Sequence, residues 1–333
     1  MSEALTMPGS LPSAGNPTSS DRYIACIPIF NDWASARVIV ERLLAEARTH
    51  GRGLEVLLVD DGSTEAPSLE SWPCREQVRV LRLRRNLGHQ RSITIGLTYI
   101  YNHLPCRGVI VLDGDGEDNP ADVETLLREL EAAQYQAAVF AQRQKRTESL
   151  LFRFFYWVFR LVHWTLTGRK VEVGNFSVLP FAMLGRLVGV SEMWNHYAAA
   201  MVKARLPRRL IPLARGHRLH GQSRMNFVSL VTHGLSAISV FSDEIGVRLL
   251  VGLTGAFVLL CVAFVTVWLI GPEVGATWWM MARLETLLLT LLLCLFLAVA
   301  FVLIILQGRN LNAFIPQRDY EVFILEVLEP ARG

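Results

Sequence analysis

The sequence predicts an α/β domain with a mainly parallel sheet, followed by two helices that cross a membrane. In the first half of the chain, short apolar runs alternate with segments of helical periodicity, which is the order typical of a parallel sheet covered by helices. In the second half, residues 249–270 and 287–306 contain no charged residue. Each is long enough to cross about 30 Å of hydrocarbon.

The predicted strands and helices alternate from the start of the domain. We expect strands at 23–29, 55–59, 78–83 and 109–112, and helices at 34–47, at 90–101 and from Pro120 to about 133. Polar residues follow three of the strands, at 31–32, 60–61 and 113–117. Because ligands bind at the carboxyl edge of such sheets, we expect these three clusters to form one site.

The cluster after the fourth strand has the pattern of a metal site. Residues i and i+2 of a strand face the same side, so Asp113 and Asp115 can bind one cation, and Glu117 extends the spacing by one step. Carboxylate oxygens suit Mg²⁺ or Mn²⁺. A single cluster of this kind is also typical of an Asx-turn or a helix cap, but three at strand ends of one sheet favour a ligand site.

The motifs and the charge pattern limit the classes of protein to which this chain can belong. No G-x-G-x-x-G, G-x-x-x-x-G-K-[ST] or G-x-S-x-G occurs, which removes the main support for a dehydrogenase, a P-loop NTPase or an α/β-hydrolase. The net charge is +3, and arginines cluster at 82–91, 143–160 and 205–224. Because the same chain is expected to span a bilayer, we interpret these clusters as sites for anionic phosphates rather than for nucleic acid.

The second half predicts a multi-pass protein of the inner, cytoplasmic membrane. Its spans are 249–270 and 284–306, joined by a short connector with tryptophans at the interface. Arg248 precedes the first span and Arg309 follows the second, so the positive-inside rule places the catalytic region and both termini in the cytoplasm. Residues 1–20 are expected to be a disordered leader and 307–333 a cytoplasmic tail.

Two further segments are expected to lie along the membrane surface. Residues 150–168 are apolar, but Arg153 and Arg160 share one helical face. Burying both arginines in hydrocarbon would cost about 2.5–3.5 kcal/mol each, so an interfacial helix is favoured. Residues 226–248 are interpreted in the same way, as a helix leading into the first span. The spans could also mediate assembly into a homo-oligomer.

Four motifs in order resemble those of family-2 glycosyltransferases. They are Ile27-Pro28-Ile29-Phe30-Asn31-Asp32, Val59-Asp60-Asp61-Gly62-Ser63, Arg85-Asn86-Leu87-Gly88-His89, and the segment from Val111 to Pro120. A catalytic domain, here 21–225, followed by two spans resembles the polyisoprenyl-phosphate glycosyltransferases, a type that includes dolichyl-phosphate mannose synthase and bacterial undecaprenyl-phosphate glucosyltransferases. The resemblance implies a nucleotide-sugar-binding, Rossmann-like domain of the GT-A type.

The resemblance also implies roles for individual residues. Asp113 and Asp115 match the metal ligands that bridge the donor diphosphate, while Glu117 stands where many relatives have Gln. The implied donor-binding residues are Pro28, Phe30, Asp32, Val59, Asp60, Asp61, Gly114 and Arg143. Gly174-Asn175-Phe176-Ser177 resembles the Gly-Asp-Phe-Arg stretch of the family. Arg218 and Arg224 lie in a segment that resembles its Arg/Gly/Ser/Lys signature, which implies contact with phosphate.

The implied reaction is metal-dependent transfer of a sugar, with inversion, from a nucleoside-diphosphate sugar to a polyprenyl phosphate. A lipid phosphate is largely dianionic at neutral pH, so the reaction needs no strong general base. The segment 191–196 lacks the Glu-Asp pair of relatives that act on hydroxyl groups. Two alternatives stay open: a hydroxyl acceptor with Glu192 or His196 as the base, and a noncatalytic membrane scaffold.

Overall fold

The computed structural model describes residues 21–331, except for 66–68, 71, 73, 144–149, 170–173, 215, 217, 220–226, 271–276 and 310–313. The predicted leader, residues 1–20, therefore lies outside the described residues. The chain divides into two compact units. The first contains residues up to 145, 172–222 and 313–333, and the second contains 146–171 and 223–312.

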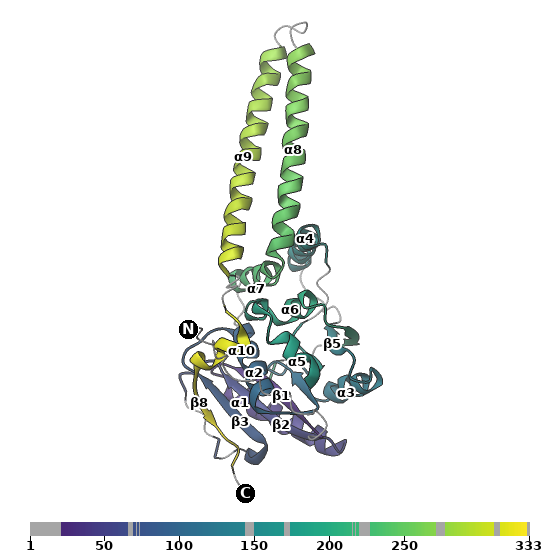
Figure 1. Cartoon of the computed structure of the whole chain (residues 1–333), viewed down its shortest axis with the longest axis vertical. Coiled ribbons are helices and arrows are strands. Elements are labelled where there is room, and N and C mark those ends of the chain that lie inside the picture. The colour runs from purple at the N-terminus through teal and green to yellow at the C-terminus, as the bar shows by residue number, and fades with distance from the viewer. Residues whose placement is uncertain are drawn as a thin grey trace, which may run out of the picture. The chain divides into compact units, whose positions relative to one another are not determined.

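A mixed sheet forms the centre of the first unit (Figure 1). Among the described residues it has eight strands in the order β7-β5-β6-β4-β1-β2-β3-β8. Their bounds are β1 Arg22–Ile29, β2 Gly53–Asp60, β3 Val78–Leu83, β4 Gly108–Val111, β5 Ala138–Arg143, β6 Ser177–Pro180, β7 Arg208–Leu213 and β8 Ile324–Leu328. The central strands β4, β1, β2 and β3 are parallel, whereas β6 and β8 run antiparallel to their neighbours.

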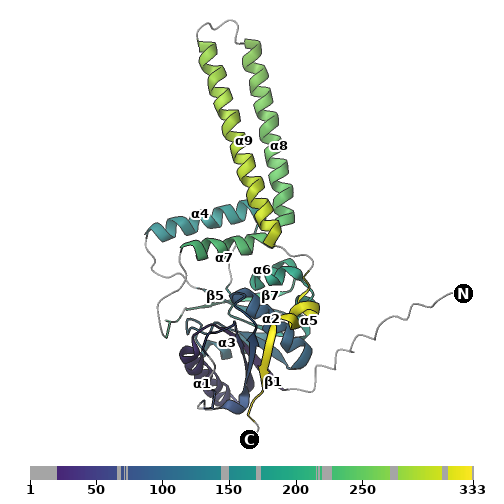
Figure 2. The same ribbon diagram turned by 90° about the vertical axis from the view of Figure 1, so that its left-hand side faces the viewer.

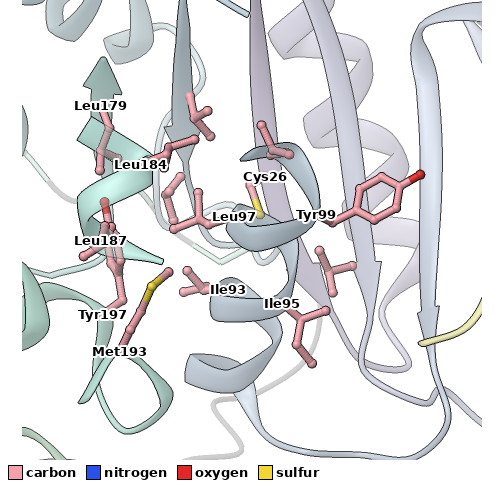
Figure 3. Close-up of a cluster of buried hydrophobic side chains, with 14 of the residues drawn as sticks. Cys26, Ile93, Ile95, Leu97, Tyr99, Leu179, Leu184, Leu187, Met193 and Tyr197 are labelled. Carbon is pink, nitrogen blue, oxygen red and sulfur yellow. The ribbon is translucent and has the colours of Figure 1, made fainter. Parts of the chain in front are cut away.

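Helices cover both faces of this sheet because side chains alternate along its strands. On β1, Ile24 and Cys26 face one core, and Ala25 and Ile27 face the other. The first core receives α2 (His89–His103), α5 (Phe181–Leu187) and α6 (Tyr197–Lys203), and the second receives α1 (Trp33–Thr49) and α3 (Asp122–Ala132). Figure 3 shows the side chains of α2 gathered with those of residues 179–197 in the first core.

The four predicted strands correspond to β1–β4, and the prediction of a mainly parallel α/β sheet is confirmed. The predicted helices correspond to α1, α2 and α3. The edge strands β7 and β8 and the inner strands β5 and β6 were not predicted. Their patterns are weak because β7 is largely exposed and carries Pro212 inside it, and because β6 has four residues that are all buried.

Most of the segment predicted to be a cytoplasmic tail, from Phe314 onward, is part of the first unit. It forms α10 (Pro316–Asp319), a turn of 3₁₀ helix (Tyr320–Phe323) and β8, which pairs with β3. The rings of Phe314 and Phe323 pack on Trp194, with centroids 4.0 Å and 5.0 Å away. From Phe314 onward, the prediction that 307–333 is a tail separate from the catalytic domain is wrong, because apolar side chains of the described residues complete the core of the first unit.

The second unit contains the long helices. It has α4 (Leu150–Thr167), α7 (Phe227–Ser239), α8 (Ser242–Ile270) and α9 (Thr277–Arg309). The helices α8 and α9 lie side by side (Figure 2). The predicted helix 226–248 is divided, because α7 ends at Ser239 and α8 begins at Ser242. Asp243 and Glu244 lie in the first turn of α8, where negative charge is favourable.

One of these helices is long and apolar enough to cross a membrane when the described residues are judged by length and composition. It is Met281–Gly308, within α9, whose most apolar window has a mean hydropathy of 3.3 and no buried residue. This segment contains the whole of the second predicted span, 284–306. The first predicted span, 249–270, forms the greater part of α8.

Candidate active site

The structure brings the three polar clusters to one edge of the sheet, as the sequence predicts. β1, β2 and β4 are neighbouring parallel strands, so their carboxyl ends meet. Backbone and side chain also connect the loops after β1 and β2. Asn31 N–H donates to Ser63 Oγ at 2.9 Å, and Thr64 N–H donates to Asn31 Oδ1 at 2.9 Å. The loops therefore form one connected surface.

Two of the predicted donor-binding residues are buried under this edge of the sheet and stabilise it. Val59 is fully buried in the core. The carboxylate of Asp60 is also buried, and it accepts hydrogen bonds from Ser63 N–H at 2.9 Å and Arg82 Nε at 3.2 Å. Both side chains are inaccessible to a ligand in this conformation, so direct donor contact by either residue is not supported.

Asp61 holds the loop that leads into α2. Its two carboxylate oxygens accept hydrogen bonds from the backbone N–H groups of Leu87 at 2.7 Å and Gly88 at 2.9 Å. Burial raises the pKa of Asp61 above its usual value, although these hydrogen bonds oppose the shift. Gly88 has φ = 94°, a left-handed conformation that suits glycine. His89, the first residue of α2, is thereby placed beside the metal motif.

His89 lies against Asp113. Its Nε2 is 3.1 Å from Asp113 Oδ1 and 3.0 Å from Asn175 Nδ2. Partial desolvation of the ring lowers the pKa of His89, but the negative charges of Asp113, Asp115 and Asp118 outweigh that effect and raise its pKa above the usual value. His89 lies in the motif 85–89, in which the sequence predicts no role for the histidine itself. Its position at a strand-to-helix junction of that motif was the available signal.

The loop after β4 orders the predicted metal ligands. Asp113 N–H donates to Asp118 Oδ2 at 2.9 Å, and Glu117 N–H donates to Asp115 Oδ1 at 2.9 Å. A Cβ atom on Gly114 would lie 3.0 Å from Pro28 O, so glycine lets the loop pack closely on the end of β1. Pro28 thus contributes through packing, and the buried carboxylate of Asp118 orients the backbone of Asp113.

A second loop, which follows β7, docks on the metal motif through its described residues 214, 216, 218 and 219. Gly216 N–H donates to Glu117 O at 2.8 Å, and Leu219 N–H donates to Asp115 O at 3.0 Å. Between them, Arg218 Nη2 donates to Asp115 Oδ2 at 2.8 Å. The structure thus brings together two residues that the sequence analysis assigned to separate motifs.

The remaining predicted site residues are placed as follows. Phe30 is 37% exposed and Asp32 is half-buried, so both side chains are open to a ligand. Arg143 is the last residue of β5, but its side chain lies outside the described part of the chain. Arg224 and residues 144–148 of the basic segment also lie outside it.

The side chains of Asp113 and Asp115 are of the type that binds a hard divalent cation. Asp113 and Asp115 offer carboxylate oxygens, the preferred ligands of Mg²⁺ and Mn²⁺. Each carboxylate has a basic partner, His89 or Arg218. Within the described residues, however, no three His, Cys, Asp or Glu side chains are grouped to hold a metal ion. The structure therefore provides the two aspartates but does not group Glu117 with them.

The two residues considered as a general base for a hydroxyl acceptor have structural partners. Glu192 Oε1 is 2.8 Å from Lys203 Nζ. His196 caps α6, because its Nδ1 accepts a hydrogen bond from Ala199 N–H at 3.3 Å. The His196 side chain is also buried.

Comparison with known proteins identifies the family of this chain. Residues 24–192 match the family described as Glycosyl transferase family 2. A dodecaprenyl-phosphate galacturonate synthase of Rhizobium johnstonii is 27% identical over 161 residues, which cover 47% of this chain and 46% of that protein. An undecaprenyl-phosphate 4-deoxy-4-formamido-L-arabinose transferase of Pectobacterium carotovorum is 33% identical over 129 residues, or 37% of each protein. The matched segment spans less than half of either relative.

Solved structures agree on the fold. A crystal structure of glucosyl-3-phosphoglycerate synthase from Mycobacterium tuberculosis with Mn²⁺, UDP-glucose and phosphoglyceric acid has a TM-score of 0.51 and 13% identity. That match covers 69% of this chain and 81% of the other. A second structure of the same synthase with these ligands has a TM-score of 0.50 and 15% identity, covering 73% and 86%. The first unit has a GT-A-type α/β fold, and the chain belongs to glycosyl transferase family 2.

Proposed function

We propose that this protein transfers a sugar from a nucleoside-diphosphate sugar to a polyprenyl phosphate at a membrane, with inversion at the anomeric carbon. The observation that carries the proposal is the pairing of Arg218 with Asp115 at the carboxyl edge of the sheet. This pairing joins a carboxylate motif suited to a metal–diphosphate with an arginine suited to a phosphate. The names of the relatives, both of them polyprenyl-phosphate enzymes, support the same acceptor class.

Asp113 and Asp115 are the residues that would hold Mg²⁺ or Mn²⁺, with Glu117 as a third candidate. When bound, the cation would neutralise charge on the departing nucleoside diphosphate. Phe30 and Asp32 would contact the donor, and Asp61 would act by holding the loop 85–88. Arg143 is proposed as a further contact to the donor phosphates.

The acceptor phosphate would act directly as the nucleophile. One of its oxygens would form a bond to the anomeric carbon, while the bond from that carbon to the donor diphosphate breaks and its electron pair leaves with the diphosphate. Arg218, and Arg224 in the same segment, would hold the anionic acceptor close to the donor. A dianionic phosphate has no proton to lose in this step.

The contacts that Glu192 and His196 make with other residues of the protein favour a phosphate acceptor over a hydroxyl acceptor. A general base needs an accepting atom within reach of the substrate. Glu192 is paired with Lys203, and His196 Nδ1 already accepts a backbone N–H.

We further propose that α8 and α9 both cross the membrane. The chain leaves the first unit at residue 222 and returns to it by residue 313, and β8 pairs with β3 inside that unit. Both flanks of the helix pair must therefore lie on the same side of a membrane, which requires an even number of crossings. If Met281–Gly308 crosses, α8 must cross as well.

The helix α4 is proposed to lie along the membrane surface. Trp157, Leu161 and Trp164 recur at the spacing of one helical face, and all are exposed. Arg160 is exposed as well, as expected for a basic residue near lipid headgroups. With the flanking arginines taken as cytoplasmic, the first unit would face the cytoplasm from the inner membrane.

A direct assay tests the proposal. The full-length protein in detergent is incubated with labelled UDP- and GDP-sugars, Mg²⁺ or Mn²⁺, and undecaprenyl or dolichyl phosphate. We expect one donor to yield a labelled lipid, and we expect Asp115→Asn to lose at least about 100-fold in turnover. Failure to form a glycolipid with any donor would refute the acceptor assignment. Wild-type turnover in Asp115→Asn would refute the metal assignment.

A further inference from the structure

Arg82 lies between two carboxylates on neighbouring strands. In the register of the sheet, Arg82 of β3 pairs with Asp60 of β2 on one side and with Glu326 of β8 on the other. Its Nε donates to Asp60 Oδ2 at 3.2 Å, and its Nη1 donates to Glu326 Oε1. Residues that pair across neighbouring strands present their side chains on the same face of a sheet. The three side chains therefore form a row of alternating charge across β2, β3 and β8.

The charge of Asp60 is balanced by Arg82. The Asp60 side chain is fully buried, whereas 23% of the Arg82 side chain is exposed. Among the described residues, the ion pair of Asp60 is with Arg82. A buried carboxylate that loses its cationic partner is strongly destabilised, because it has left water without compensation. Without Arg82, the segment around Asp60 would have to open toward water.

Asp60 in turn holds the loop after β2, and that loop holds Asn31. Asp60 Oδ1 accepts a hydrogen bond from Ser63 N–H at 2.9 Å. Ser63 Oγ accepts one from Asn31 N–H at 2.9 Å, and Asn31 Oδ1 accepts one from Thr64 N–H at 2.9 Å. We call Arg82, Asp60, Ser63 and Asn31 the Arg82 network.

The network fixes an unusual backbone conformation at Asn31. Its φ is 51°, in the left-handed region that residues other than glycine seldom adopt, although asparagine tolerates it. The loop after β2 holds both the main chain and the side chain of this residue. Phe30 and Asp32, its neighbours in the sequence, have side chains open to a ligand. The turn of the chain at Asn31 therefore decides where these two side chains lie.

We propose that Arg82 is a positioning residue for the donor. By neutralising Asp60, it keeps the loop after β2 in contact with the loop after β1. That contact holds Phe30 and Asp32 in place for the nucleoside diphosphate. The inference rests on the proposed function, because Phe30 and Asp32 are taken there as donor contacts.

The same strand provides a matched control. Arg79 of β3 also bridges β2 and the C-terminal segment, because its Nη2 is 2.8 Å from Glu329 Oε2 and its Nη1 is 3.9 Å from Glu55 Oε2. Its side chain is as well buried as that of Arg82, with 14% exposed. Arg79 is the second residue of β3, however, and its partners lie outside the loops after β1 and β2. Loss of Arg79 should disturb the edge of the sheet without reaching Asn31.

The test measures binding of UDP and, separately, GDP by isothermal titration calorimetry, with Mn²⁺ and the full-length protein in detergent. We expect Arg82→Met to weaken nucleotide binding about 10–100-fold and Arg79→Met to leave it unchanged. Arg82→Lys, which keeps the charge but not the planar set of donors, should fall between Arg82→Met and the unmodified protein. Unmodified affinity in Arg82→Met, or an equal loss in Arg79→Met, would overturn the inference.

A double variant separates charge balance from general damage to the sheet. Asp60→Asn keeps an oxygen for the Ser63 N–H but carries no charge, so Arg82 is no longer needed to neutralise it. Asp60→Asn combined with Arg82→Met should therefore bind nucleotide more tightly than Arg82→Met alone. A double variant that binds no more tightly would contradict the proposal.

Thermal melting of each variant reports whether the fold is retained. If Arg82→Met does not fold, Arg82→Lys and Arg79→Lys provide the same comparison, and equal affinity in these two variants would overturn the inference.

Steady-state kinetics provide a second measurement. The Arg82 network contains no residue of the metal motif, so we expect Arg82→Met to raise KM for the donor by a larger factor than it lowers kcat. A fall in kcat with an unchanged KM would contradict a role in positioning the donor.

Asp32→Ala separates this inference from the proposed function. If Asp32→Ala binds nucleotide as the unmodified protein does, or if the unmodified protein binds neither UDP nor GDP, the donor assignment fails and the inference fails with it. If Asp32→Ala loses binding and Arg82→Met does not, only the inference about Arg82 fails.

Discussion

Arg218 Nη2 lies 2.8 Å from Asp115 Oδ2, although 103 residues separate the two in the sequence. The contact is made by two loops that follow β7 and β4, and two backbone hydrogen bonds flank it. The arginine assigned to the acceptor phosphate therefore neutralises a carboxylate assigned to the metal. A ligand that approaches this motif meets both groups together.

We predict that Arg218→Ala lowers turnover with a polyprenyl phosphate by about 100-fold, because the site loses a fixed positive charge beside two anionic substrates. Arg218→Lys should recover part of the activity, since lysine keeps the charge but not the planar set of donors. Initial rates at saturating donor would measure both. Arg37→Ala, which removes only an exposed pair with Glu41 on α1, should leave the rate unchanged. Equal rates in Arg218→Ala and Arg37→Ala would contradict the assignment.

Gly116 is predicted to be essential for the docking of loop 214–219. It has φ = 89°, and a Cβ atom there would lie 2.6 Å from Leu219 Cγ. Gly116→Ala should cost about 1–2 kcal/mol in backbone strain and displace Leu219, lowering turnover about 10–100-fold. The comparison variant is Gly51→Ala. Gly51 has φ = 64° with nothing near its Cβ position, so this variant should lose stability but keep its turnover per folded molecule. Unchanged turnover in Gly116→Ala would show that docking is dispensable.

A third prediction concerns acid stability. Arg52 bridges Glu124 and Glu131 of α3. Burial raises the pKa of Glu124, but hydrogen bonds from Arg52 and Arg128 outweigh it and lower the pKa overall. The Arg52 hydrogen bond likewise lowers the pKa of Glu131. Because the pKa values are lowered in the folded state, their stabilising effect is present above the ordinary value of 4.5. It is lost as the pH falls through the lowered values.

Arg52→Met should therefore reduce the free energy of unfolding by about 1–3 kcal/mol at pH 7. The difference between variant and unmodified protein should shrink as the pH falls below 4.5. Thermal unfolding of the full chain in detergent at several pH values measures this. Arg37→Met, at an exposed pair, should change the free energy of unfolding by at most about 0.5 kcal/mol. A difference that stays constant with pH would contradict the electrostatic explanation.

The segment after α9 is predicted to stabilise the first unit. Phe314 is buried and its ring centroid is 4.0 Å from that of Trp194. Phe314→Ala should reduce the free energy of unfolding by about 3–5 kcal/mol, as measured by thermal melting. Val322→Ala, at a residue that is 66% exposed, should have little effect. Deletion of residues 314–333 should be more damaging than Phe314→Ala, because it also removes β8. A truncated chain as stable as the full one would show that the segment is not part of the core.

The central strands could be predicted because each one is specified by a short stretch of the sequence. Apolar runs form most of β1, β2 and β4, whereas apolar residues in β3 alternate with Arg79 and Arg82. Polar residues that follow β1, β2 and β4 stop these strands at the same edge. The edge strands could not be predicted in this way. β8 pairs with β3 although the entire helix pair α8–α9 lies between them in the sequence. The apolar residues of β8 therefore have a partner only after the chain has returned to the first unit.

The sequence by itself determined that the chain has an α/β domain, acidic and amide groups at its carboxyl edge, and long apolar helices after it, because strand and helix periodicities and strand-end polar residues are visible within short windows. Only the tertiary structure decided which of these groups meet. It buried Asp60 and Val59, used Asp61 to hold a loop, placed His89 on Asp113 and joined Arg218 to Asp115. These contacts depend on packing between segments that are far apart in the chain. They therefore cannot be predicted from the residue pattern of a short segment.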